Sequence, residues 1–376
     1  MNILLVGGSG IISGYVCNYA LSAGHNVTIL NRGKRKMNKN AVSIVADIRS
    51  ETVQQISQKL GKNDFDVVVD FISYDVAQLK KSLEIFSHRC KQYIFISSAT
   101  VYATDDVITE NTPTNNNNWD YAVKKAQCED YLKNFSSELN CAYTIVRPYI
   151  TYDVSRVPYQ FSTIEYYTII NRCRNEKPLP IYGQNVRCTL TSSKDFAIAI
   201  NGLFLNEKAF NQDFHITSDY STTWENVGKI IFESVNVKPL FVDIPHELLN
   251  VTNSKLGFDA NEILGDKGRN MVFDNSKIKS AVEGFKGDLS FENEIKETIV
   301  YYNTAPKKIN YAWDARIDWL ISSALKRNNI KTKNYKLSLN AYTEKLSLNN
   351  KIKYLLNRYT FTYYLVRVLR KIKSKL

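Results

Sequence analysis

Residues 3–14, which read ILLVGGSGIISG, constrain the fold more than any other part of the chain. An apolar run of strand length meets four small residues and then a stretch that can form a helix. In such a turn Gly7 permits the tight bend, and Gly10 lets a pyrophosphate approach the free N–H groups of the helix. Ser13 stands where a third glycine is usual, and it is small enough for close packing of helix on strand. The sequence therefore predicts a dinucleotide-binding turn that opens a βαβ unit.

The first 150 residues alternate short apolar runs with longer mixed stretches. Nearly continuous runs of Val, Ile, Leu and Phe suit parallel strands covered on both faces, and we expect strands at 2–6, 26–31, 41–46, 66–71, 92–97 and 142–147. Helices fit between them, for example at 14–23, 50–60 and 119–135. This alternation predicts the α/β class, with a doubly wound parallel (Rossmann) sheet and right-handed crossovers.

The pattern along the chain predicts three parts. Residues 1–150 form the dinucleotide-binding core. Residues 151–304 form a smaller mixed substrate lobe, interleaved with the core, that closes a cleft; its expected elements include helices at 165–173 and 224–235 and a strand at 209–216. Residues 305–376 form a basic, aromatic C-terminal extension with helical segments.

Basic residues are concentrated in this extension. The chain carries a net charge of +12, but residues 326–376 hold 14 Lys and Arg and a single acid, so the remainder is close to neutral. Apolar side chains in residues 351–376 fall on two opposite helical faces, which predicts two short helices or a break near Thr360. A basic amphipathic helix binds anionic membrane surfaces. We favour this partner for 351–376 over another protein subunit, and nucleic acid is the least favoured.

The sequence shows no signal for a membrane span, a metal site or a disulfide framework. It has no uninterrupted apolar stretch of about 18 residues, and its first strand begins at Asn2 or Ile3. We therefore expect a cytoplasmic protein, at most peripheral at the inner face of a membrane. The six cysteines form no CxxC pair, and the four histidines fit no ligand spacing. We therefore expect neither a metal site nor a disulfide framework.

The residue after the second strand bears on the choice of dinucleotide. NAD sites usually place an acid there for the ribose 2′-hydroxyl, whereas this chain has Arg32, which can pair with a 2′-phosphate. Arg32 thus favours NADP slightly over NAD; the alternative is a solvated charged loop shared with Lys34 and Arg35. Asp47, after the third strand, can accept a hydrogen bond from the adenine amino group. Further residues assigned to the cofactor site are Ile11, Ile12, Ile48 and Phe71.

Further along the chain, a tyrosine and a lysine have a spacing that suits proton transfer. Tyr121 and Lys125 are four positions apart and hence lie on one face of a helix. A lysine ammonium near a phenol favours the phenolate, and the same lysine can donate to the nicotinamide ribose. Ser98 follows the fifth strand, where ligands of open α/β sheets lie, and can bind a substrate hydroxyl or carbonyl oxygen.

These motifs together resemble those of a known family. GGSGIIS, the Asp of VADIRS, SSATVY, YAVKK and RPYITY occur in the order found in extended short-chain dehydrogenases/reductases, the nucleotide-sugar epimerase and dehydratase group. The similarity covers roughly residues 1–300. Ser13 and Arg32 are more similar to the atypical branch of this superfamily, which includes RNA-associated members.

The resemblance implies roles for individual residues. Ser98, Tyr121 and Lys125 match the catalytic triad of the family. Tyr121 and Lys125 also contact the cofactor in this reading, and Pro148 and Tyr149 match the stretch beside the nicotinamide.

Substrate contacts are also implied by the resemblance. Arg187 matches the arginine that binds the diphosphate of a nucleotide sugar, a bidentate role suited to a guanidinium. Lys267 or Arg269 assists it, and Thr100 joins Ser98 in the substrate site. Dehydratases of the family carry an Asp-Glu pair where this chain has Ala99 and Thr100. Dehydration is therefore disfavoured.

The sequence thus predicts an NAD(P)-dependent nucleotide-sugar epimerase, an isomerase of polysaccharide biosynthesis that acts as a homodimer and works through a keto-sugar. One alternative is an NADPH-dependent keto-sugar reductase that uses the same residues. Another, of a different class, is a non-catalytic cofactor-binding protein that associates with RNA or acts as a scaffold.

Overall fold

The computed structural model of the protein describes residues 1–35, 37–249 and 260–337, together with positions 348, 352, 365 and 368. The chain divides into two compact units. The first unit comprises residues 1–153, 188–221 and 270–293. The second unit comprises the described parts of residues 154–187, 222–269 and 294–376. The predicted domain boundaries at residues 150 and 304 stay predictions.

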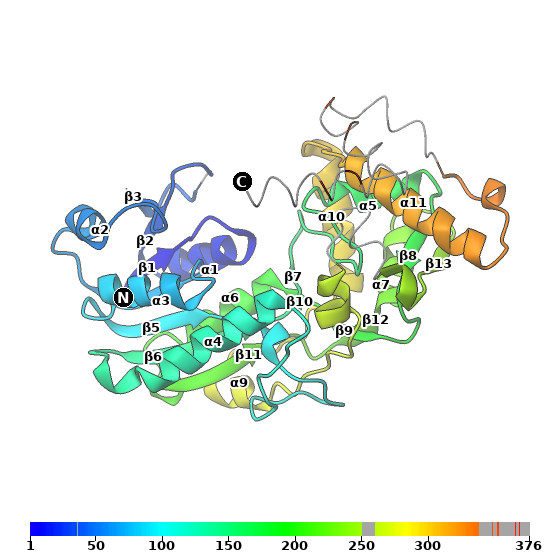
Figure 1. The fold of residues 1–376 in the computed structure, drawn as a ribbon. Coiled ribbons are helices and arrows are strands. Elements are labelled where there is room, and N and C mark those ends of the chain that lie inside the picture. The colour runs from blue at the N-terminus through cyan, green and yellow to red at the C-terminus, as the bar shows by residue number, and fades with distance from the viewer. Residues whose placement is uncertain are drawn as a thin grey trace. The chain divides into compact units, whose positions relative to one another are not determined.

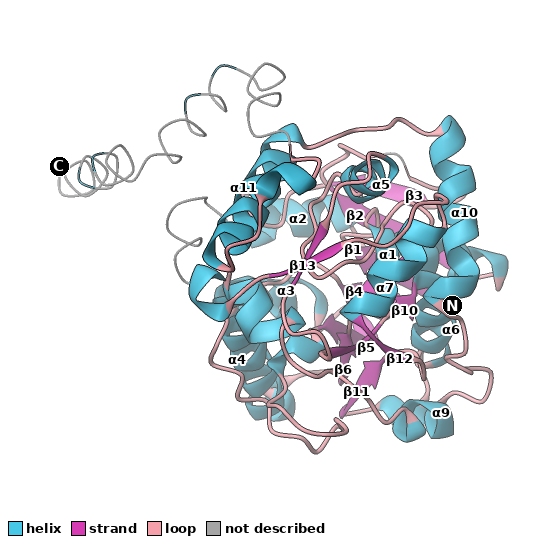
Figure 2. Ribbon diagram, turned by 90° about the vertical axis from the view of Figure 1, so that its right-hand side faces the viewer, coloured by secondary structure: helices cyan, strands magenta, loops and turns pink. Residues whose placement is uncertain are grey.

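Strands of the first unit form a parallel sheet (Figure 1), and Figure 2 labels all of its strands one after another. They are β1 (Asn2–Val6), β2 (Asn26–Asn31), β3 (Val42–Val45), β4 (Phe65–Asp70), β5 (Cys90–Ile96), β6 (Ala142–Pro148) and β11 (Gln212–Ile216). Within the described residues the sheet has seven strands in the order β11-β6-β5-β4-β1-β2-β3. Leu5 of β1 lies opposite Ile29 of β2 and Val69 of β4. The predicted α/β class with a doubly wound parallel sheet is confirmed.

Helices cover both faces of this sheet because its strands alternate apolar side chains to either side. Ile3 and Leu5 face one core, which α1 (Ile11–Ser22) and α6 (Ser193–Gly202) complete. Leu4 and Val6 face the other core. That second core is completed by α2 (Val53–Leu60), α3 (Val76–Phe86) and α4 (Asp120–Asn134). Smaller elements of the unit are η1 (Ala99–Val101), η2 (Ser136–Glu138), β7 (Thr151–Tyr152), β10 (Thr191–Ser192), η3 (Glu207–Ala209) and α9 (Ser276–Ala281).

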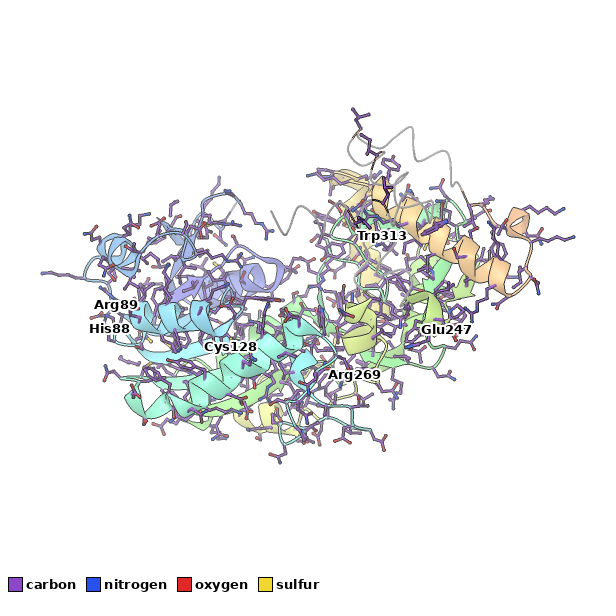
Figure 3. The ribbon with its side chains drawn as sticks, in the orientation of Figure 1. His88, Arg89, Cys128, Glu247, Arg269 and Trp313 are labelled. Carbon is purple, nitrogen blue, oxygen red and sulfur yellow. The ribbon has the colours of Figure 1, made fainter. Side chains whose placement is uncertain are left out.

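Several elements, among them α1, β5, α2 and β11, differ in place or extent from the sequence-based expectation. Helix α2 begins at Val53, three residues later than expected, because the Thr52 hydroxyl accepts a hydrogen bond from the Gln55 amide and caps the helix there. Strand β11 comes from the part of the chain assigned to the smaller lobe, yet it pairs with β6 and joins the main sheet. The cysteines are free, and Cys128, labelled in Figure 3, is buried between α4 and the sheet.

The second unit is built around short strands and amphipathic helices. Its elements include α5 (Tyr167–Arg174), β8 (Leu179–Ile181), α7 (Trp224–Glu233), β13 (Phe241–Asp243), the π-helix η4 (Ile263–Lys267), α11 (Tyr311–Arg327) and η5 (Thr332–Asn334). Strands β8 and β13 pair in parallel. Three of the described elements cross a boundary between the units, namely β9 (Arg187–Thr189), β12 (Ser221–Thr223) and α10 (Phe291–Thr304).

A buried cluster of four charges fastens α11 to α5, and we call it the α11 ion cluster. It consists of Arg172, Lys177, Asp314 and Asp318, whose side chains are 0–4% exposed. Arg172 Nη1 and Lys177 Nζ each donate to both carboxylates, with Lys177 Nζ lying 2.6 Å from Asp318 Oδ2. Trp313, labelled in Figure 3, directly precedes Asp314 in the sequence and is also buried. The sequence reading did not foresee this helix or its partners.

The two short helices expected in residues 351–376, with a break near Thr360, lie outside the described residues, apart from single positions. Among the helices that the structure describes, none is both long enough and apolar enough to cross a membrane.

Candidate functional site

The glycine turn after β1 has the geometry that the sequence predicted for residues 7–10. Gly7 has a φ of +88°, and a Cβ on this residue would lie 2.2 Å from Ile72 Cγ2, so neither the conformation nor the space admits a side chain. Ser13 closes the turn, since its Oγ donates to the Gly7 carbonyl at 3.1 Å and accepts from the Gly10 amide at 2.8 Å. The serine that replaces the usual glycine therefore braces the loop with hydrogen bonds, in addition to being small.

A cavity of about 350 Å³ opens at the carboxyl ends of β1, β2, β3 and β4. From β1 the chain builds β2 and β3 on one side and then crosses over to build β4 on the other side of β1. Open α/β sheets bind ligands at such a reversal of strand order. The cavity brings together seven of the predicted cofactor residues, namely Gly7, Gly10, Ile12, Arg32, Asp47, Ile48 and Phe71. Among the described residues that line the cavity, none comes from α4 or β6. Ile11, another predicted cofactor residue, is the first residue of α1 and is not one of the lining residues.

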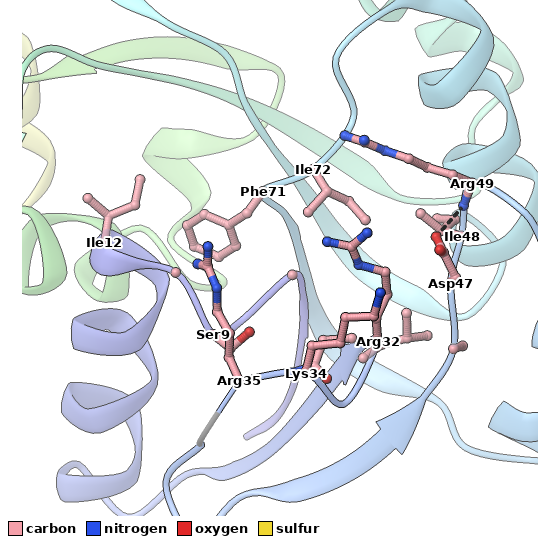
Figure 4. Close-up of a pocket in the computed structure, with 15 residues that line it drawn as sticks. Ser9, Ile12, Arg32, Lys34, Arg35, Asp47, Ile48, Arg49, Phe71 and Ile72 are labelled. Carbon is pink, nitrogen blue, oxygen red and sulfur yellow. Dashed lines mark hydrogen bonds between the residues drawn. The ribbon is translucent and has the colours of Figure 1, made fainter. Parts of the chain in front are cut away.

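Basic side chains dominate the outer part of the cavity wall. Arg32, Lys34, Arg35 and Arg49 all line it, against the single carboxylate of Asp47. Figure 4 shows the guanidinium groups of the three arginines extending toward the side walled by Phe71 and Ile72. Asp47 Oδ1 accepts from the Arg49 amide at 3.1 Å, which fixes the start of the loop that carries Arg49. An excess of positive charge at this position suits a ligand with an additional phosphate.

The predicted proton-transfer pair lies on α4, in the same unit as the cavity. Lys125 is 4% exposed, and its Nζ donates to the carbonyls of Ser73 at 2.7 Å and Ile96 at 2.8 Å. Burial lowers the pKa of Lys125 to about 8, although nearby negative charge opposes the shift. The ring of Tyr121, one helical turn earlier, packs between Tyr74 and Trp119, with centroid distances of 5.6 and 4.9 Å.

The remaining predicted residues of this region surround the ends of β5 and β6. Ser98 is 7% exposed and caps η1, where its Oγ accepts a hydrogen bond from the Thr100 hydroxyl at 3.0 Å. Pro148 ends β6, and the ring of Tyr149 packs on Phe273 at a centroid distance of 5.2 Å. The catalytic and nicotinamide-contacting roles of these residues stay predictions.

A buried ionic network holds α4 against the sheet. Arg147 of β6 is fully buried and donates to both carboxylate oxygens of Glu129 on α4, the shortest contact being 2.6 Å from Nη2 to Oε2. The same guanidinium donates to Asp213 of β11 and to the hydroxyl of Tyr102, and Ser97 donates to Glu129. Since Tyr121 and Lys125 share this helix with Glu129, the network fixes their height above the sheet. Sequence reasoning overlooked it, although a charged residue in the apolar strand β6 was a visible signal.

The residues predicted to bind the diphosphate of the nucleotide sugar belong to the second unit. Arg187 lies at the start of β9 with an exposed side chain. Lys267 is buried at the end of η4, where its Nζ contacts Glu262 Oε1 at 2.5 Å and Ser162 Oγ at 3.2 Å. Arg269 donates to the Gly265 carbonyl at 2.9 Å. Their substrate roles stay predictions.

The doubly wound sheet, the braced glycine turn and the basic cavity are features expected of a dinucleotide-binding protein of the α/β class. The model of the NAD dependent epimerase/dehydratase family matches residues 3–209, which is more than half of the chain. The chain therefore belongs to this family, as the motifs indicated.

A curated protein with a known name is similar to part of the chain. The chloroplast stem-loop binding protein of 41 kDa b of Arabidopsis thaliana is 25% identical over 241 residues, which are 60% of this chain and 61% of that protein. The chain thus matches about three fifths of the length of this curated relative.

Solved structures with a similar fold include several epimerases. An epimerase from Methanothermobacter thermautotrophicus has a TM-score of 0.66 and 16% identity, covering 80% of this chain and 92% of that chain. The UDP-glucose 4-epimerase of Thermus thermophilus, in complex with NAD, has a TM-score of 0.63 and 15% identity, covering 81% of this chain and 100% of that chain. At these identities the likeness shows the fold alone.

Proposed function

We propose that the protein is an NAD(P)-dependent nucleotide-sugar epimerase in which Tyr121, Lys125 and Ser98 act on the sugar. One observation carries this proposal: a buried lysine, oriented by the Ser73 and Ile96 carbonyls, lies one helical turn from a tyrosine in the unit that holds the dinucleotide cavity. Membership of the epimerase/dehydratase family supports the same reaction class. Ala99 and Thr100 stand in place of the paired acids of a dehydratase, which favours epimerisation over elimination.

The residues that line the cavity are compatible with a dinucleotide, and we assign its parts to them as follows. The Gly7–Gly10 turn and the start of α1 would hold the pyrophosphate, and Arg32 and Asp47 would hold the adenosine end. A bound nicotinamide would supply reversible hydride transfer at a sugar carbon. Tyr121 would take the proton from the sugar hydroxyl, and the Lys125 ammonium would favour the phenolate form of Tyr121. Ser98 would hold the reacting oxygen, and Arg187 the diphosphate.

Mass spectrometry of the purified protein and a turnover assay test this proposal together. We expect the protein to carry NAD or NADP through purification and to interconvert a UDP- or dTDP-sugar without added cofactor. An NADPH-dependent keto-sugar reductase would instead consume NADPH at 340 nm in proportion to product. Failure to turn over any sugar nucleotide in a loaded, folded protein would count against both enzymes.

We propose that the cofactor is NADP, because four basic side chains surround the cavity and no acid follows β2. The substitution Arg32→Ala should raise the Kd for NADP⁺ by about tenfold to hundredfold, as expected for the loss of a hydrogen bond to a charged group, and should change the Kd for NAD⁺ little. Calorimetric titration measures both constants. Lys39→Ala is the control, since Lys39 is exposed on the same loop and is not among the residues that line the cavity. Equal losses for the two nucleotides would contradict an NADP preference.

A second candidate function is binding of an RNA stem-loop, and the name of the Arabidopsis relative favours it. Such binding would persist in a Tyr121→Phe protein and would weaken steeply with salt, because phosphate contacts release counterions. Titration with a labelled stem-loop RNA distinguishes it from the enzymatic function.

A further inference from the structure

Asp70 ends β4 and is completely buried, yet the reaction outlined above gives it no part. Its Oδ2 accepts from three hydroxyls, those of Ser73, Ser82 and Tyr93, at 2.5, 2.7 and 2.6 Å. Its Oδ1 accepts from the backbone amides of Ile72 and Ser73 at 2.9 and 3.0 Å. Five donors around one carboxylate satisfy a buried charge fully.

The loop that Asp70 holds has two sides with different neighbours. Phe71 and Ile72 form part of the cavity wall. The Ser73 carbonyl accepts a hydrogen bond from Lys125 Nζ. Because both amides on Oδ1 belong to this loop, its backbone cannot move without breaking bonds to the carboxylate. One buried acid thus fixes both a wall of the dinucleotide cavity and a partner of the predicted catalytic lysine.

We propose that Asp70 is a positioning residue, which aims Lys125 and the cavity wall through the loop at residues 71–73. A lysine ammonium has three N–H donors, and the Ser73 and Ile96 carbonyls take two of them. The direction of the third is then set by the other two. The inference rests on the role proposed for Lys125 above.

The charge of Asp70 also reaches Lys125. The ionisable groups that act on Lys125 are Asp70 from β4 and Cys128 and Glu129 from α4 itself. Burial lowers the pKa of Lys125, and the negative charge of Asp70 is the largest influence that raises it. Neutralising Asp70 should therefore lower the lysine pKa further, whereas loosening the loop should also weaken the nucleotide site.

The substitution Asp70→Asn tests the inference, because it preserves the shape of the side chain and removes its charge. NMR titration of protein labelled at the lysine ε-carbons, with the Lys125 signal assigned from a Lys125→Arg sample, reports the lysine directly. We expect a wild-type midpoint of about 8 and a shift of about one unit downward in the variant. The Kd for NADP⁺ should rise by about tenfold, as is usual when an orienting partner is lost. Neither measurement requires turnover, so an inactive protein leaves the outcome decidable.

The control is Asp66→Asn, the same change on the same strand, at a carboxylate that pairs with Lys91 near the surface. It should leave both the Lys125 titration and the NADP⁺ affinity unchanged. If Asp70→Asn fails to fold, Ser73→Ala removes one donor to the carboxylate but keeps the carboxylate charge and the carbonyl that binds Lys125. The Lys125 midpoint should then stay near that of the wild type, and the Kd for NADP⁺ should rise by less than in Asp70→Asn. A folded Asp70→Asn protein with wild-type titration and affinity, or a folded Ser73→Ala protein with wild-type affinity, overturns the proposal.

Discussion

The substitution Asp314→Ala is expected to lower the free energy of unfolding of the second unit by about 3–5 kcal/mol. Asp314 accepts from both cations of the α11 ion cluster, and all four side chains are 0–4% exposed. Removing Asp314 deprives both Arg172 and Lys177 of one carboxylate partner in a site that water does not reach. The penalty comes from this lost partner of two buried cations, since a buried pair that is intact adds little to stability by itself.

Urea denaturation followed by tryptophan fluorescence measures the effect, because three of the four tryptophans, Trp224, Trp313 and Trp319, belong to the second unit. Transitions of the two units must be fitted separately if they do not coincide. Lys326→Ala is the control, an exposed residue on the same helix. If Asp314→Ala unfolded at the same urea concentration as Lys326→Ala, the cluster would not be a closed ionic unit.

The substitution Tyr121→Phe should reduce turnover of the nucleotide sugar by about two to four orders of magnitude. The ring would keep its packing between Tyr74 and Trp119, so the fold should survive. The substitution removes the hydroxyl that we propose exchanges a proton with the sugar. Initial rates at saturating substrate, together with the Kd for NADP⁺, separate this chemical effect from a binding effect.

Tyr131→Phe provides the matched control, because Tyr131 lies on the same helix and stacks on Phe135 at a centroid distance of 5.3 Å. Loss of its hydroxyl should leave the rate near that of the wild type. A Tyr121→Phe protein with an undiminished rate would exclude Tyr121 as the proton acceptor and would support a non-catalytic role such as RNA binding.

Local patterns in the sequence predicted the first unit well. The first two strands were expected at their observed positions, because apolar runs and a glycine turn are read over a few neighbouring residues. About half of the cavity wall followed from the same motifs. Arg49 was overlooked although its neighbours Asp47 and Ile48 were assigned to the site, because the family motif that pointed to this strand end identifies the Asp and carries no signal for a basic residue two positions later.

Features that depend on distant backbone or on charges facing inward escaped prediction. The Ser73 carbonyl that binds Lys125 has no signature in a side-chain pattern, since any residue supplies a carbonyl. Helix α11 was overlooked for a related reason. Its inward face carries Asp314 and Asp318, so the stripe of apolar residues that marks an amphipathic helix is interrupted where the helix is most buried.

The position of β11 at the edge of the main sheet has a consequence for how the protein emerges during translation. The sheet receives its last strand only after the ribosome has passed residue 216, and α6, which completes one of the two cores, comes only shortly before. A fragment ending near residue 150 would leave the edge of β6 unpaired and would lack α6, which completes the core shared by α1 and the sheet. Such a fragment would be prone to aggregate, and nascent chains of that length face the same hazard before they are complete.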